Sequence, residues 1–82
     1  MLLEIITPDR EVYKGEVDAA TFPGSKGRFQ VLRNHAPLIS ALEAGSLVYE
    51  DKDGRHELNV DGGVVEVLNN QISVLAEAAT PV

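Results

Sequence analysis

Turn signals divide this chain into short runs of β-forming residues, and no segment carries the pattern of a long amphipathic helix. Proline, glycine and asparagine pairs recur at Pro8-Asp9, Pro23-Gly24, Gly62-Gly63 and Asn69-Asn70, with apolar and often β-branched residues between them. Frequent turns around short alternating runs are typical of antiparallel sandwiches and barrels. We therefore predict an all-β fold, a flattened antiparallel β-sandwich or barrel of about ten short strands.

The clearest local prediction is a hairpin around Asn69-Asn70. Asparagine tolerates the left-handed backbone that a two-residue hairpin turn needs. Such a turn places β-branched side chains of both strands on one face, as a core requires. The pairs on that face are Val67 with Ile72 and Val65 with Val74. The opposite face is mixed, since Val64 and Leu75 lie there beside polar residues, and we expect a partner to cover part of it.

Other elements follow from local signals. A second hairpin turn is expected over Asp51–Gly54, where the glycine supplies a positive φ. Pro37–Leu42 fits either a short helix opened by the proline or a strand, and its β surroundings favour the strand. Gly15 interrupts an alternating run and predicts a bulge or bend. The folded domain is expected to span residues 1–79, and residues 80–82 are interpreted as the end of a fraying C-terminal tail.

The overall charge argues against nucleic-acid binding. The chain has 82 residues, of which 13 are acidic and seven are Lys or Arg, and its pI is near 4.7. A protein that binds the phosphate backbone needs a basic face. Because cysteine is absent, disulfides and thiolate metal sites are excluded. No apolar run approaches the roughly 20 residues that span a bilayer, and Met1 is followed by no signal-peptide pattern.

One segment differs in charge from the rest. Residues 19–42 contain no Asp or Glu, yet they hold three of the seven cations, Lys26, Arg28 and Arg33. Two turn-rich stretches lie within it, on either side of an apolar run that ends at Leu32. A cationic segment in an acidic protein is a candidate contact surface, because its field differs in sign from its surroundings.

No motif of catalysis or metal binding is complete. No serine or threonine stands in a nucleophile elbow or triad pattern, so His35 is interpreted as a structural or contact residue and His56 as a plain surface residue. The Asp51–Gly54 turn lacks the further ligands of a calcium loop, and Gly24–Gly27 lacks the spacing of a phosphate loop. We therefore predict no catalytic residues, no metal and no cofactor.

Several motifs follow one another in order along nearly the whole chain. They are Leu3–Asp9, Val12–Gly15, Pro23–Gly27 with Phe29–Leu32, Asn34–Leu38, Gly45–Leu47, Gly62–Val67 and Ile72–Ala76. The most specific combination is the His-Ala-Pro-Leu turn with the Gly-Gly-x-x-Glu-Val strand. Together they resemble the N-terminal β-sandwich domain of the epsilon subunit of F-type ATP synthase, which is called delta in mitochondria.

The resemblance implies a non-catalytic subunit of the central rotor stalk. Such a subunit binds the gamma subunit through one face of the sandwich, rests on the ring of membrane c subunits and couples ring rotation to the catalytic head. It lies at the cytoplasmic face of the bacterial inner membrane, or the organellar equivalent, and touches the membrane only through the complex. Carried to this sequence, the segments near the c-ring are Ser25, Lys26, Gly27 and Arg28, and Asn34, His35, Ala36, Pro37 and Leu38.

Two differences from the family pattern matter. The family often has an acidic residue where this chain has Arg28, so either the ring carries a compensating charge or Arg28 points elsewhere. Typical bacterial members continue into a C-terminal helical hairpin that binds ATP and inhibits hydrolysis, and we expect neither role from these residues. The alternative is a small β-sandwich that binds a ligand or another protein and is unrelated to ATP synthase; the low aromatic content of 5% speaks against a carbohydrate site.

Overall fold

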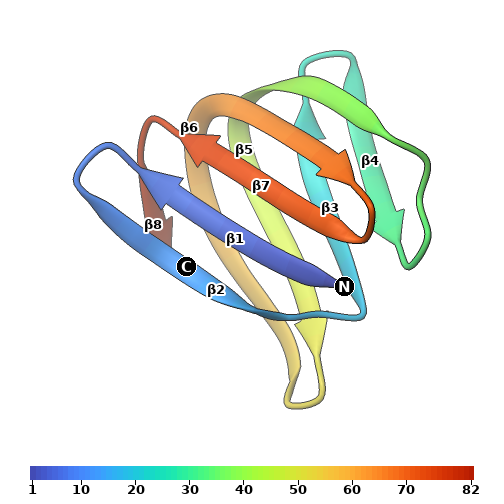
Figure 1. Cartoon of the computed structure of the whole chain (residues 1–82). Coiled ribbons are helices and arrows are strands. Elements are labelled where there is room, and N and C mark those ends of the chain that lie inside the picture. The colour runs from blue at the N-terminus through green and yellow to red at the C-terminus, as the bar shows by residue number, and fades with distance from the viewer.

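The computed structural model describes all 82 residues and consists of strands and turns without a helix. Figure 1 shows the strands packed in two layers, which confirms the predicted all-β sandwich. The strands are β1 (Leu2–Thr7), β2 (Arg10–Glu16), β3 (Ala19–Gly24), β4 (Gly27–Leu32), β5 (Leu38–Asp51), β6 (Gly54–Leu68), β7 (Gln71–Ala76) and β8 (Ala79–Pro81). Their number is eight instead of about ten, because two of them are long.

The long strands β5 and β6 form one continuous hairpin that belongs to both layers. Their register holds from the pair Leu38–Val67 to the pair Asp51–Gly54. The prediction that Gly62-Gly63 is a turn is wrong: both glycines lie inside β6, with φ of 87° and 133°. β5 and β6 curve over together (Figure 1), so that a single sheet of order β2-β1-β7-β6-β5-β3-β4 folds onto itself. The smallest extent of 20 Å fits two sheets about 10 Å apart.

The sequence predicted an antiparallel sandwich, but the structure contains one parallel strand pair. β1 pairs antiparallel with β2 on one side but parallel with β7 on the other, where Leu3 lies opposite Ile72. A parallel pair needs a long crossover connection. Here the crossover is most of the chain, since β2 to β6 lie between the two strands in sequence. This pairing places the first strand beside the seventh within one layer.

The bulge predicted at Gly15 lies instead at Val12. The register of β1 with β2 shifts by one residue there, while Gly15 is paired regularly with Leu3. The Tyr13 ring covers Gly15, because a Cβ at that position would be 2.6 Å from the tyrosine hydroxyl. The glycine is therefore explained by the close approach of an aromatic ring and not by a bulge.

The two hairpin turns follow the predicted patterns. Leu68 pairs with Gln71, and Asn69 and Asn70 have φ of 51° and 61°, as the sequence predicted. The four β-branched side chains on the inner face of that hairpin are all buried. In the second hairpin, Gly54 pairs with Asp51 and has a φ of 116°. The strand expected over residues 37–42 is the first part of β5, which begins at Leu38.

The C-terminal segment is more ordered than the sequence suggested. We expected a fraying tail, but Ala79–Pro81 form β8, which pairs antiparallel with β6. Ala79 is buried there, opposite Val60.

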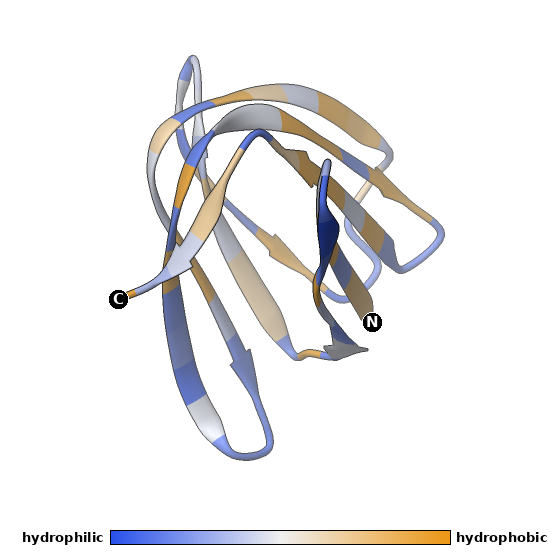
Figure 2. Ribbon diagram, turned by 90° about the vertical axis from the view of Figure 1, so that its left-hand side faces the viewer, coloured by the Kyte–Doolittle hydropathy of each residue, from blue (hydrophilic) through white to orange (hydrophobic).

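The core lies between the two layers and is built from the inward residues of nearly every strand. Its largest fully buried side chains include Phe22, Leu3, Ile5, Leu47 and Ile72. Phe22 also packs against Phe29, with ring centroids 5.5 Å apart. The projecting end of the β5–β6 hairpin is hydrophilic instead (Figure 2).

Candidate partner-binding surfaces

The β3–β4 loop and the segment leading into β5 line a common groove of about 680 Å³. The loop is fixed there because the Ser25 backbone N–H donates to the carbonyl oxygen of Ala41 at 3.0 Å. Six of the residues predicted from the sequence line this groove: Ser25, Lys26, Gly27, Arg28, His35 and Leu38. Phe29, Ile39, Ser40 and Ala41 complete it. Two stretches that are separate in sequence thus form one surface, which we call the β3–β5 groove.

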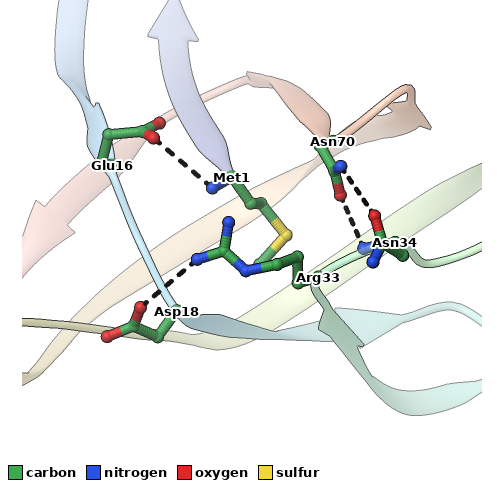
Figure 3. Close-up of polar contacts among 6 residues, drawn as sticks. All are labelled: Met1, Glu16, Asp18, Arg33, Asn34 and Asn70. Carbon is green, nitrogen blue, oxygen red and sulfur yellow. Dashed lines mark hydrogen bonds and ion pairs between the residues drawn. The ribbon is translucent and has the colours of Figure 1, made fainter.

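The other three predicted residues, Asn34, Ala36 and Pro37, lie beside this groove and do not line it. Asn34 has a φ of 67°, and its backbone N–H donates to the Asn70 side-chain oxygen at 2.6 Å. The Asn70 amide nitrogen donates back to the Asn34 side-chain oxygen at 2.9 Å (Figure 3). This reciprocal pair ties the turn after β4 to the β6–β7 turn. Ala36 and Pro37 are exposed.

The three cations of the acid-free segment have different surroundings. Arg28 donates to the backbone oxygen of Ser46 at 2.7 Å, so its guanidinium is directed toward β5. Arg33 lies 3.9 Å from an Asp18 carboxylate oxygen (Figure 3). Lys26 makes neither a hydrogen bond nor an ion pair within the chain and is exposed. Lys26 and Arg28 thus both contribute positive charge to the β3–β5 groove, because a neutral carbonyl oxygen does not cancel the charge of Arg28.

A second exposed surface covers the outer side of the layer that contains β1, β7 and β6. Leu75 is 54% exposed and lies between Ile6 of β1 and Val64 of β6. Leu68 and Ile39, 46% and 71% exposed, border a shallow depression on the same side. We call these five residues the outer apolar face. Glu66 and Ser73 lie between these two groups, so the face is mixed, but exposed apolar side chains gathered on one sheet face make it a candidate interaction site.

A polar and aromatic cluster near the β5–β6 turn was missed by the sequence reasoning. The His56 Nε2 lies 3.0 Å from Asp51 Oδ1, and the His56 ring stacks on Tyr49 at 4.9 Å. Tyr49 in turn contacts Tyr13, with ring centroids 4.4 Å apart. His56 does lie at the surface, with 39% of its side chain exposed, but the interpretation missed its contacts with Asp51 and Tyr49. The register of the Asp51–Gly54 hairpin contained the signal, since it places Tyr49 opposite His56.

This cluster shifts the pKa of its members in different directions. The hydrogen bond from His56, followed by the Asp53 backbone N–H, holds the pKa of Asp51 below its usual value. Burial raises the pKa of Tyr13 and of Tyr49. None of these groups lies beside a nucleophile in the manner of a catalytic set. The cluster thus links the two strands of the projecting hairpin.

Replacing His56 with alanine should raise the pKa of Asp51 toward the unperturbed value of about 3.9. A carboxyl whose folded pKa is lowered stabilises the fold above its unfolded pKa, and this stabilisation is lost as the pH falls through the folded pKa. The variant should therefore lose less stability than the parent on acidification from about pH 5 to pH 2. NMR titration of the Asp51 carboxyl and thermal melts over this range measure both effects.

The matched control is Arg55→Ala, which removes the contact of Arg55 with Glu57 at 3.3 Å but leaves the Asp51–His56 pair in place. The Asp51 pKa should stay unchanged in this control. An Asp51 titration curve in His56→Ala identical to that of the parent would contradict the assignment of the shift to His56.

The structure holds no group of three or more His, Cys, Asp or Glu side chains placed to bind a metal ion. None of its elements is a helix able to cross a membrane. What it does present is a cationic groove and an apolar sheet face on a small rigid sandwich. These are the features of a protein-interaction domain.

The family to which this domain belongs is shown by comparison. The family model of the beta-sandwich domain of the ATP synthase delta/epsilon chain matches residues 1–82. The chain therefore belongs to this family, as the motifs of its sequence indicated.

The ATP synthase epsilon chains of two bacteria are among its relatives. That of Maridesulfovibrio salexigens is 46% identical over 79 residues, which make up 96% of this chain and 56% of the relative. That of Nitratidesulfovibrio vulgaris (strain Miyazaki F) is 48% identical over 77 residues, 94% of this chain and 58% of the relative. The chain thus spans somewhat more than half the length of these relatives.

Solved structures show the same architecture. A chain of the Euglena gracilis mitochondrial ATP synthase, from a structure of its OSCP, F1 and c-ring, matches with a TM-score of 0.92 and 25% identity over 99% of this chain and 52% of that chain. A chain from the central stalk and c-ring structure of the Tetrahymena thermophila mitochondrial ATP synthase matches with a TM-score of 0.84 and 17% identity, covering 99% and 66%. The second match shows the common fold alone.

Proposed function

We propose that this domain acts in the central stalk of an F-type ATP synthase as a non-catalytic rotor subunit. In this function it links the gamma subunit to the membrane c-ring and couples proton translocation to ATP synthesis. The observation that carries the proposal is the match of the delta/epsilon-chain family over residues 1–82. The likeness to a chain in an ATP synthase structure that contains F1 and the c-ring supports it.

The two exposed surfaces suit two partners. The β3–β5 groove holds most of the residues that the family resemblance places near the c-ring, so we assign the ring to it. The outer apolar face, which includes Leu75, is assigned to gamma, because a permanent protein contact is more apolar than the remaining surface. Such a domain lies at the cytoplasmic face of a bacterial inner membrane and reaches the membrane only through the complex.

The fold is mechanically suited to this position. The β5–β6 hairpin runs unbroken through both layers, and β1 is paired on both sides within one of them. A force applied at the groove is therefore carried to the outer apolar face by paired backbone and a close-packed core instead of by loops. No chemical step is required of the domain in transmitting torque.

A capture experiment tests the proposal. The tagged chain is mixed separately with the purified gamma subunit and the detergent-solubilised c-ring of its own organism, and retention is measured after washing. We expect both to be retained. Retention of neither partner would overturn the proposed function, and the variants described below test each surface separately.

A further inference from the structure

We propose that the β3–β5 groove recognises a loop of its ring partner that carries an acidic side chain beside an apolar one. This inference rests on the proposed function, because it names the chemistry of the c-ring contact. It concerns one site, the space between Lys26 on the β3–β4 loop and the first residues of β5.

The charge of the groove is the first reason. The residues that line it include the cations Lys26 and Arg28 but no Asp or Glu, although the chain as a whole has a formal charge of −6. Arg28 donates one hydrogen bond to the neutral Ser46 carbonyl oxygen and keeps its positive charge. The Lys26 ammonium is left without a partner on an exposed loop. A carboxylate is the group that complements it, and complementary charge favours both encounter and correct orientation.

The apolar floor of the groove is the second reason. Phe29 and Leu38 are half-buried and pack against the core, so each presents one side to the groove. Ile39, 71% exposed, stands at the edge and belongs also to the outer apolar face. An apolar side chain placed here is removed from water without displacing any core residue. The occupant thus needs an acidic group at one end and an apolar group at the other.

The groove is also preformed, because hydrogen bonds fix both of its sides before any partner binds. Ser25 is hydrogen bonded to Ala41, and Gly27 closes the loop with a φ of 125°. On the other side, the Asn34–Asn70 pair holds the turn that leads into His35. A preformed site spends little binding free energy on ordering loops. A phosphate group offers nothing to the apolar floor, so a carboxylate of a protein loop with an apolar side chain beside it fits the groove better.

The test is a charge exchange across the contact. Binding of the chain to the detergent-solubilised c-ring is measured at low and high salt, with Lys26→Glu as the variant. We expect this variant to bind at least about tenfold more weakly at low salt and to lose most of the salt dependence. Reversing the acidic residue of the ring loop to lysine should restore its binding. Lys52→Glu, at the far end of the molecule on the β5–β6 turn, should bind like the parent (Figure 1).

Each outcome has a distinct meaning. Ring binding that is equal for the parent and Lys26→Glu would overturn this inference and leave the proposed function standing. A parent chain that does not bind the ring at all would overturn the c-ring assignment itself. Lys26-dependent binding to phosphatidylglycerol vesicles without the ring, together with no effect on ring binding, would identify a lipid headgroup as the anion and overturn the inference. Gamma binding should be the same in all variants.

Discussion

Gly63→Ala is expected to destabilise the fold by about 3 kcal/mol or more, a large part of the stability of an 82-residue domain. Gly63 has a φ of 133°, a conformation that side chains with a Cβ rarely adopt. A Cβ there would overlap the carbonyl oxygen of Leu75 and approach the Cα of Ala76 to 2.8 Å. Both atoms belong to the backbone of β7, which cannot move away without breaking its pairing with β6.

The matched control is Gly54→Ala. Gly54 also has a positive φ, 116°, but a Cβ there meets nothing within 4 Å. It should lose about 1–2 kcal/mol through backbone strain alone. Thermal and urea unfolding measure both, and each 1 kcal/mol should lower the Tm by about 4–8 °C in a domain of this size. Equal losses in the two variants would show that the overlap with β7 contributes nothing.

Gly63 also illustrates where prediction from the sequence fails. Two adjacent glycines at positive φ are compatible with a turn or with a bend inside a strand. The choice depends on the partner, because β5 stays paired with β6 on both sides of the glycines. That pairing is not contained in the local sequence. The same holds for β1 and β7, whose parallel contact joins residues almost a whole chain apart.

The β6–β7 hairpin was predictable because all its determinants lie within a dozen residues. Asn69 and Asn70 accept the left-handed backbone, and the alternation of the flanking residues allows one register only. The candidate groove was predictable in part. The absence of acidic residues from positions 19–42 is visible in the sequence, but the engagement of Arg28 by Ser46 is not, since it depends on how β4 lies against β5.

Leu75→Glu is expected to weaken gamma binding strongly while the chain stays folded. Leu75 lies in the outer apolar face, directly between Ile6 and Val64, and is already 54% exposed. Glutamate at an exposed strand position leaves the core unchanged, so the Tm should fall by only a few degrees. Within an interface, however, it buries an unpaired charge at an apolar contact. A loss of 2–4 kcal/mol, roughly 30- to 1,000-fold in Kd, is the expected size of such an effect.

The matched control is Leu32→Glu, because Leu32 is 52% exposed on β4, a strand that contributes nothing to the outer apolar face. Titration calorimetry with purified gamma and circular dichroism of each variant give affinity and folding separately. Gamma affinity that is unchanged in Leu75→Glu, or is reduced equally in Leu32→Glu, would refute the assignment of gamma to this face. Ring binding should persist in Leu75→Glu, since the groove charge at Lys26 is untouched. If the domain connects two partners, a variant of one surface must lose binding only of the partner assigned to that surface.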